Sequence, residues 1–285
     1  AGEPHTIRFR VPEGVTQWDD IVHGETRFEN ASIEDFIILR TDGTPIYNLA
    51  VVSDDIDMRI THVLRGDDHI SNTPKQMLLY QALGSALPTF AHVPMILGPD
   101  GKRLSKRHGA TAVGEYKNDG ILPDAMVNFL ALLGWNPGTE QEVFTVDELI
   151  NAFTLEKINK KSSVFDTKKL EWLNGQHIAQ RSAEELEEIV IAGLVEQGIA
   201  THVELREERA WLHQLIDLLK VRARVMDDIV AHAKPFFADA IEYDAAAVAK
   251  HWKDPEPRGR LAGLRHALEN LPEWTLPALE EALRS

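Results

Sequence analysis

The segment Leu97–Gly109 concentrates positive charge between turn-forming residues. It reads LGPDGKRLSKRHG, and four cationic side chains lie within six residues, at Lys102, Arg103, Lys106 and Arg107. Glycines allow such a loop to move, and its cations can offset the charge that grows on a polyphosphate as pyrophosphate leaves. These residues fit both a phosphate-binding loop and a solvated basic turn, and the turn is the more common explanation.

Arg65 is the second candidate for chemistry. It follows the apolar run Ile60–Leu64, which predicts a short buried strand. Ligands of open α/β sheets bind beyond the carboxyl ends of strands, and a guanidinium can hold a carboxylate with two parallel hydrogen bonds. Arg65 is therefore a candidate for binding a carboxylate ligand. A salt bridge with Asp67 or Asp68 is the alternative interpretation.

Two acidic groups raise the question of a metal site. The first is Asp67-Asp68-His69, and the second is Asp54-Asp55 with Asp57. Adjacent residues rarely converge on one ion, and a solvated acidic turn explains the second group more simply. The chain has no cysteine, which excludes thiolate zinc ligands and disulfides. We therefore expect neither a zinc site nor another metal site built by protein residues.

Strand patterns dominate the first 65 residues. Thr6–Val11 alternates apolar and basic residues, as a half-buried strand does. Phe36–Leu39 and Ile46–Val52 are apolar runs on either side of Thr41-Asp42-Gly43-Thr44. A turn-rich connection between two such runs predicts a hairpin.

Helix signals dominate the remainder. Thr73 can cap a helix that ends at Gly84, and Pro123–Leu133 begins with proline and precedes a glycine. After about residue 155, five stretches have helical periodicity: Ala183–Gln197, Arg206–Leu219, Ala223–Phe237, Ala245–Trp252 and Arg260–Glu269. The order of elements predicts an α/β part followed by an all-α part. We expect two domains, residues 1–155 and 156–285.

The composition favours a soluble globular protein. The 285 residues carry a net charge of -15, which argues against indiscriminate coating of nucleic acid but leaves room for a local basic face. No apolar run reaches the length of about 18 residues that a membrane span needs. The first residues lack the basic start and apolar stretch of a signal peptide. We expect a cytoplasmic protein that does not bind membranes.

Several segments resemble one family, in the family's own order. Arg103-Leu104-Ser105-Lys106-Arg107 resembles the KMSKS signature of class I aminoacyl-tRNA synthetases. The surrounding LGPDGKRLSKRHGA resembles the glutamyl-tRNA synthetase form of that signature. Tyr47–Gly84 and Lys157–Ile178 are also similar to that family. Because the similarity covers most of residues 6–240, chance agreement at a single motif does not explain it.

The resemblance implies roles for particular residues. It gives Lys106 the catalytic role, as the signature-loop lysine that contacts the ATP phosphates and stabilises the transition state of adenylate formation. It implies a glutamate site and an ATP site: Tyr47 and Arg65 for glutamate, and Arg103, Ser105, Asp68 and His69, together with Lys106, for ATP.

The resemblance also implies an activity, a fold and partners. The activity is ligation of L-glutamate to tRNA(Glu) through a glutamyl-adenylate made from ATP, with Mg²⁺ held by the ATP phosphates. The fold is a partial class I Rossmann-like catalytic domain, followed by a helical stem-contact and anticodon-binding domain. The lysine-rich stretch Lys157–Gln176 would contact tRNA phosphates, although a solvated linker has the same composition. We expect a monomer.

The HIGH motif of class I synthetases does not occur in the sequence. We therefore expect the chain to be the C-terminal portion of a bacterial-type glutamyl-tRNA synthetase, inactive by itself. The alternative is a non-catalytic tRNA-binding or regulatory relative. A shorter paralogue that glutamylates a tRNA base and a glutaminyl-tRNA synthetase both fit the helical second half less well. The sequence identifies neither the anticodon-reading residues nor whether tRNA(Gln) is also charged.

Overall fold

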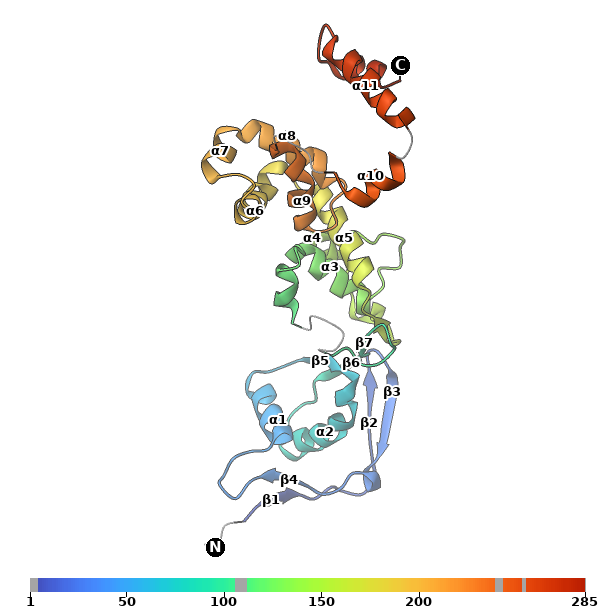
Figure 1. Cartoon of the computed structure of the whole chain (residues 1–285). Coiled ribbons are helices and arrows are strands. Elements are labelled where there is room, and N and C mark those ends of the chain that lie inside the picture. The colour runs from blue at the N-terminus through green and yellow to red at the C-terminus, as the bar shows by residue number, and fades with distance from the viewer. Residues whose placement is uncertain (1–4, 106–111, 239–242, 253–254, 285) are drawn as a thin grey trace. The chain divides into compact units, whose positions relative to one another are not determined.

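The computed structural model describes residues 5–105, 112–238, 243–252 and 255–284 (Figure 1). The chain divides into two compact units, residues 1–232 and 233–285. Strands β1 to β8 and helices α1 to α8 belong to the first unit, α9 crosses the division, and α10 to α12 belong to the second. None of the helices in the described ranges has the length and apolar character required to cross a membrane.

A β-α-β unit forms the centre of the α/β part. Strand β5 (His62–Gly66) pairs in parallel with β6 (Thr89–Val93), and helix α2 (Thr73–Ala82) connects them in the chain. The strand predicted before Arg65 and the helix predicted after it are thus confirmed. The register of the pair sets Arg65 opposite His92. Both residues therefore lie near the carboxyl ends of two parallel strands, where α/β sheets bind ligands.

A hairpin that the sequence patterns did not reveal packs beside this unit. It consists of β2 (Val15–Asp20) and β3 (Gly24–Glu29), paired antiparallel. Alternate residues of β2 are buried, and its last residue, Asp20, is one of them. The backbone N–H of Ile21 donates to the carbonyl oxygen of Phe90 at 3.0 Å, which joins the hairpin to β6.

The hairpin predicted over residues 36–52 forms only in part. β4 (Phe36–Leu39) is a strand as predicted, but it pairs antiparallel with β1 (Ile7–Phe9). The expected turn is present, with the Thr44 backbone N–H donating to Asp42 Oδ1 at 2.9 Å. A single antiparallel bridge between Leu39 and Pro45 is all that remains of the predicted pairing.

The second predicted strand of that hairpin, Ile46–Val52, is wrong. The segment is helix α1 (Tyr47–Asp57). Leu49, Val52 and Ile56 recur at helical spacing and pack against buried residues of α2. Burial of this stripe outweighs the preference of isoleucine and valine for strands.

Helices form the core that follows the basic loop. Short β7 (Ile96–Leu97) pairs in parallel with β8 (Ser163–Val164). Helices α3 (Pro123–Gly134) and α5 (Thr167–Gln180) pack together around a cluster that includes Phe129. The prediction of a helix at Pro123–Leu133 is therefore confirmed.

Helices also form in the predicted stretches that follow residue 155, whereas α4 was not predicted. The first unit also contains α4 (Val146–Ala152), α6 (Ala183–Glu196), α7 (His202–Glu207) and α8 (Arg209–Lys220), and α9 (Met226–Phe237) begins in it. The stretch predicted as one helix over Arg206–Leu219 is divided between α7 and α8. Short 3-10 helices lie at Asn30–Ser32, Asp67–Asn72, Val113–Lys117 and Leu155–Lys157.

The second unit is helical. It contains α10 (Ala245–His251), α11 (Pro255–Glu269) and α12 (Leu276–Arg284), and α12 was not predicted. The predicted fold class, an α/β part followed by an all-α part, is confirmed. The domain boundary at residues 155 and 156 remains a prediction.

Candidate functional site

Arg65 lies at the centre of a polar network beside β5 and β6. Its Nε donates to Nε2 of His92 at 3.2 Å, and its Nη2 donates to Oγ1 of Thr73 at 2.7 Å. The Thr73 hydroxyl is also 3.0 Å from Nε2 of His92. Two residues, His92 from β6 and Thr73 from α2, therefore fix one edge of the guanidinium.

Thr73 has a different role from the predicted one. It is the first residue of α2, whose N-cap is Asn72 and has no side-chain capping bond. Thr73 is completely buried, and its hydroxyl is used by Arg65 and His92. The sequence signal for a helix start was correct, but the hydroxyl stabilises the site rather than the helix end.

Asp20, the last residue of β2, anchors this network through a contact with His92. Its Oδ2 accepts a hydrogen bond from Nδ1 of His92 at 2.5 Å, and both side chains are fully buried. Burial raises the pKa of Asp20, but hydrogen bonds from His92, His23 and Trp18 outweigh it and lower the pKa to about 2. Asp20 is therefore a carboxylate at neutral pH, although it lies in the protein interior.

Tyrosine side chains and a carboxylate surround the guanidinium. Burial lowers the pKa of Arg65, and interactions with Tyr47 and Asp55 oppose this shift. The Tyr80 hydroxyl donates to Asp55 Oδ2 at 3.2 Å. Burial and the Asp55 charge raise the pKa of Tyr80, so its hydroxyl keeps its proton. Tyr47 itself is half-exposed, so it borders the solvent side of the network.

Asp68, His69 and Arg103 lie next to this network. Arg103 Nη2 is 3.2 Å from Asp68 Oδ2, which brings the basic loop to the end of β5. The ring of His69 is centred 6.4 Å from that of Tyr47. Asp68 also packs onto Gly66, where an added Cβ would lie 2.6 Å from Asp68 Oδ1. Five of the seven predicted site residues thus lie in one region.

The basic loop begins as a tight turn after β7. The Gly98 backbone N–H donates to the Lys102 carbonyl at 2.7 Å, and Leu104 N–H donates to Ile96 at 3.0 Å. Gly101 has a φ of 72°, a conformation that favours glycine. Ser105, two residues after Arg103, is the last described residue of the loop. Lys106 lies outside the described residues, so its predicted contact with ATP stays a prediction.

Three residues of the network were not predicted as site residues: Asp20, Thr73 and His92. His92 had one usable signal, because a histidine within the apolar run Phe90–Val93 must find a partner when the strand is buried. Asp20 is 72 positions away from His92 in the chain. Nothing in its local sequence distinguishes it from its neighbour Asp19.

Other potential ligand positions lie elsewhere. Within the described ranges, no group of three or more histidine and acidic side chains is arranged to hold a metal ion. An apolar pocket of about 570 Å³ is lined by residues that include Tyr116, Met126 and Ile189. None of the predicted site residues that the structure describes lines this pocket.

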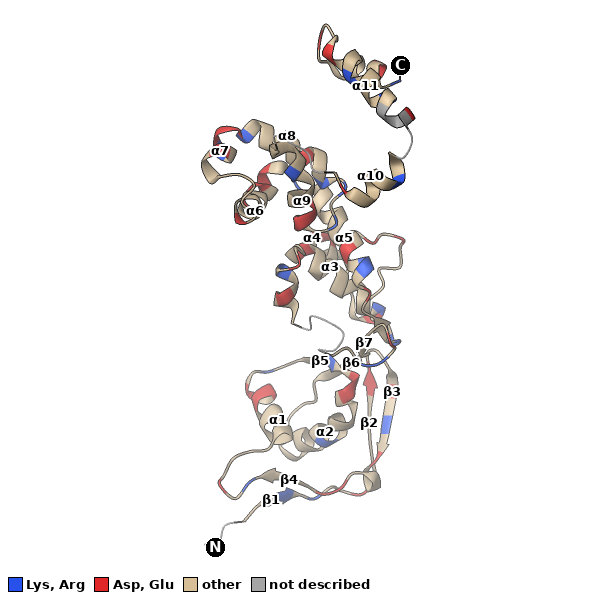
Figure 2. Ribbon diagram, in the orientation of Figure 1, with Lys and Arg blue, Asp and Glu red and all other residues tan. Residues whose placement is uncertain are grey.

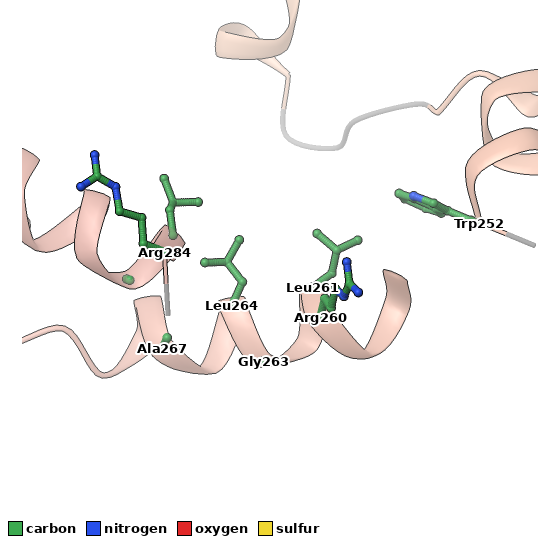
Figure 3. Close-up of a pocket in the computed structure, with 9 residues that line it drawn as sticks. Trp252, Arg260, Leu261, Gly263, Leu264, Ala267 and Arg284 are labelled. Carbon is green, nitrogen blue, oxygen red and sulfur yellow. The ribbon is translucent and has the colours of Figure 1, made fainter. Parts of the chain in front are cut away.

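A wider hollow of about 860 Å³ occurs within the second unit (Figure 3). Leu261 and Leu264 project into it from α11, and Trp252 lies across from them. Arg260 and Arg284 border it. Its described lining residues include no acidic residue and none of those predicted for glutamate or ATP.

Only some lysines of the segment Lys157–Gln176 are available to bind a polyanion. Lys157 donates to the carbonyl oxygen of Pro137 at 2.9 Å, and Lys169 forms an ion pair with Glu142. Three further lysines of this segment are exposed: Lys160, Lys161 and Lys168. Acidic and basic residues are interspersed over the helices that follow (Figure 2).

Comparison with known proteins gives the class. Residues 1–172 match the family model "tRNA synthetases class I (E and Q), catalytic domain". Residues 176–285 match the model "Anticodon binding domain". The α/β part is therefore a class I Rossmann-like catalytic domain, and a helical anticodon-binding domain follows it.

The chain belongs to the class I tRNA synthetases of the E and Q family. It is 45% identical to glutamate–tRNA ligase 2 of Rubrobacter xylanophilus over 99% of this chain and 57% of that protein. It is 48% identical to glutamate–tRNA ligase 2 of Koribacter versatilis, over 99% of this chain and 59% of that protein. The chain thus spans less than two thirds of the length of these relatives.

A solved structure agrees with these matches. The crystal structure of a glutamate tRNA ligase from Elizabethkingia meningosepticum, in complex with its amino acid, superposes with a TM-score of 0.83 at 30% identity. The match covers 99% of this chain and 58% of that one.

These comparisons correct one expectation. We expected the chain to be the C-terminal portion of a glutamyl-tRNA synthetase. That description is wrong, because the catalytic-domain match begins at residue 1 and extends to residue 172 before the anticodon-binding match begins. The similarity of short motifs identified the family, but it could not define how much of each domain is present.

Proposed function

We propose that the protein ligates L-glutamate to tRNA(Glu) in an ATP-dependent reaction with a glutamyl-adenylate intermediate. One observation carries the proposal: a partly buried arginine, Arg65, lies at the end of a parallel strand pair with one edge held by His92 and Thr73. The names of the relatives, which are glutamate–tRNA ligases, support the same activity.

Glutamate is the ligand that this site fits. The Arg65 guanidinium can only donate hydrogen bonds, so it suits the side-chain carboxylate of glutamate. Tyr47 borders the same position and interacts with Arg65. Partial burial of Arg65 lowers the local dielectric constant and strengthens its attraction for an anion. An uncharged amino-acid side chain would bring no anionic partner for this charge in addition to Asp55.

ATP would bind on the side of Asp68, His69 and Arg103, together with its Mg²⁺ ion. The side-chain carboxylate of glutamate is held by Arg65, and an oxygen of its α-carboxylate attacks the α-phosphorus of ATP. Pyrophosphate leaves with its bonding electron pair. Lys106 and Arg103 would stabilise the negative charge that develops on the departing phosphates. Ser105 would hold the loop in position. No protein nucleophile is required, because positioning and electrostatics supply the catalysis.

Transfer to tRNA completes the reaction. A hydroxyl of the terminal ribose attacks the carbonyl carbon of the adenylate, and AMP leaves. The exposed lysines Lys160, Lys161 and Lys168 are suited to contacts with tRNA phosphates. The anticodon-binding domain would read the other end of the tRNA. We propose that the protein acts as a monomer in the cytoplasm.

The test is transfer of labelled glutamate to tRNA(Glu) by the protein in its natural full-length form. The proposal predicts an acid-insoluble product that requires ATP and Mg²⁺ and carries glutamate rather than glutamine or aspartate. Tight binding of tRNA without transfer of any amino acid would instead support the non-catalytic alternative. Parallel reactions with tRNA(Gln) would show whether the protein charges it as well.

A further inference from the structure

Arg65 has two edges that can each bind a carboxylate, and one of them is occupied by the protein. In a planar guanidinium, Nε and Nη2 form one edge, and Nη1 and Nη2 form the other. Nε donates to His92 and Nη2 donates to Thr73. A carboxylate that makes two parallel hydrogen bonds must therefore use the Nη1–Nη2 edge.

The contact with Arg65 determines the tautomer of His92. A guanidinium cannot accept a hydrogen bond, so Nε2 of His92 must be the acceptor. Nδ1 then carries the ring proton and donates it to Asp20 Oδ2. Burial lowers the pKa of His92 even though Asp20 opposes the shift. His92 is therefore neutral at pH 7, as an acceptor for an arginine must be.

Asp20 is held firmly enough to fix this arrangement. Its Oδ1 accepts backbone hydrogen bonds from Val22, His23 and His92, each at 3.1 Å. Its Oδ2 accepts from the Trp18 indole at 3.2 Å in addition to His92. The carboxylate thus has little freedom to rotate. A rigid chain of contacts runs from β2 through β6 to the guanidinium.

We propose that Asp20 and His92 are positioning residues for amino-acid selection. Asp20 holds His92 in the tautomer that accepts a hydrogen bond from Arg65. His92 and Thr73 together fix the Nε–Nη2 edge of the guanidinium. The Nη1–Nη2 edge is then presented to the side chain of the substrate. This inference rests on the proposed role of Arg65 in binding glutamate. Its consequence is discrimination against glutamine, whose amide NH₂ would meet a fixed edge that only donates.

Two substitutions of His92 separate positioning from packing. In His92→Asn, the amide nitrogen can replace Nδ1 and donate to Asp20, but no atom reaches Arg65. In His92→Gln, the amide oxygen can replace Nε2 and accept from Arg65. The measured quantity is the ratio of kcat/KM for glutamate to kcat/KM for glutamine in tRNA aminoacylation by the natural full-length protein, with the KM for ATP as a control.

Positioning predicts unequal effects of the two variants. His92→Asn should lower the glutamate-to-glutamine ratio by about 10-fold or more, because small displacements of a binding group have large kinetic effects. His92→Gln should restore most of the ratio, and the KM for ATP should stay within about 2-fold in both. Equal losses in the two variants, or a change in the KM for ATP that matches the change for glutamate, would overturn the proposal.

Further variants separate this proposal from the proposed function. Arg65→Gln should itself abolish the preference for glutamate; if it does not, the role of Arg65 in the proposed function fails. If Arg65→Gln abolishes the preference but His92→Asn leaves the ratio unchanged, only the positioning proposal fails. Should His92→Asn not fold, Thr73→Val removes the other partner of the same edge with little change in shape. An unchanged ratio in that variant would also contradict the proposal.

Discussion

In the proposed function, the hydrogen bonds that hold Arg65 matter as much as its charge. A long arginine side chain on a surface would lose considerable conformational entropy on binding a ligand. Here His92 and Thr73 already restrain the guanidinium. The entropy loss occurs on folding, so the binding energy of the ligand is retained for recognition. The residues proposed to contact the ATP phosphates should instead affect adenylate formation.

Lys106 should act on adenylate formation and not on glutamate binding. In Lys106→Ala, we expect the rate of adenylate formation to fall about 100- to 1000-fold, the usual effect of removing one group that stabilises developing charge. The KM for glutamate should change little. Lys102→Ala is the matched control, since Lys102 is an exposed cation of the same loop. Pre-steady-state measurement of adenylate formation tests this prediction, and similar rates in the two variants would contradict it.

Asp20 should make the first unit sensitive to acid. Its pKa is lowered from 3.8 to about 2 in the folded protein, so its stabilisation is complete above pH 3.8 and is lost as the pH falls toward 2. A shift of this size corresponds to about 2 kcal/mol. The free energy of unfolding should therefore differ between the parent and Asp20→Asn most at pH 5 to 7, and this difference should shrink between about pH 4 and 2. Denaturant titrations at several pH values would reveal a constant difference if Asp20 were not ionised.

The candidate site residues that the sequence offered are those that belong to motifs. Tyr47, Arg65, Asp68 and Arg103 were identified because each lies in a segment similar to the family, and the structure brings them into one region. Asp20 and His92 escaped prediction because their partnership depends on tertiary structure. A carboxylate at a strand end and a histidine in a distant strand acquire a joint role only when β2 packs on β6.

Helices and strands were predicted well where apolar residues recur along a single face of the element. Helices α3, α6 and α9 have one apolar face, and their periodicity predicted them well. α1 was misassigned because a short run rich in isoleucine and valine has the composition of a strand. The β2–β3 hairpin was missed because two of the three buried residues of β2, Thr16 and Asp20, are polar and β3 has no fully buried residue, so apolar residues alternate only weakly along either strand. Such weak alternation is hard to distinguish from a loop.

Gly175 of α5 lies against the backbone of the segment before α9, so we expect that no side chain can be accommodated at this position. A Cβ there would lie 2.8 Å from the carbonyl oxygen of Ala223 and 3.4 Å from Cα of Arg224, so backbone would have to move. We expect Gly175→Ala to lower the free energy of unfolding by about 1–3 kcal/mol. Gly134→Ala, at the end of α3 with open space around it, should change it by less than about 1 kcal/mol. Thermal or denaturant unfolding measures both, and equal effects would contradict the close approach.

At the scale of the whole molecule, the two units differ in how much they bury. In the first unit, α6 buries six residues along one face. In the second, neither α10 nor α12 contains a buried residue. Helices that bury little apolar surface gain little from tertiary packing, and most helices of this length are marginal alone. The second unit should therefore open more readily than the first.

Hydrogen exchange detects this difference directly. Amides of α10 and α12 should exchange at least about 10-fold faster than those of α6, because local opening exposes them without unfolding the first unit. Mass spectrometry of peptides from each helix is a suitable measurement. Addition of tRNA should slow exchange in the second unit if the anticodon-binding domain engages it. Equal protection of α6 and α10 without tRNA would contradict the difference in burial.

The measurement that tests the central claim most directly is the effect of Arg65→Gln on the use of glutamate. Arg40→Gln is the control, since Arg40 is an exposed arginine of the same unit and directly follows β4. In tRNA aminoacylation by the natural full-length protein, Arg65→Gln should lower kcat/KM for glutamate by about 100-fold, as expected for two lost hydrogen bonds to a charged group. The KM for ATP should stay within about 2-fold. If both variants used glutamate as the parent does, Arg65 would not be the residue that recognises the substrate.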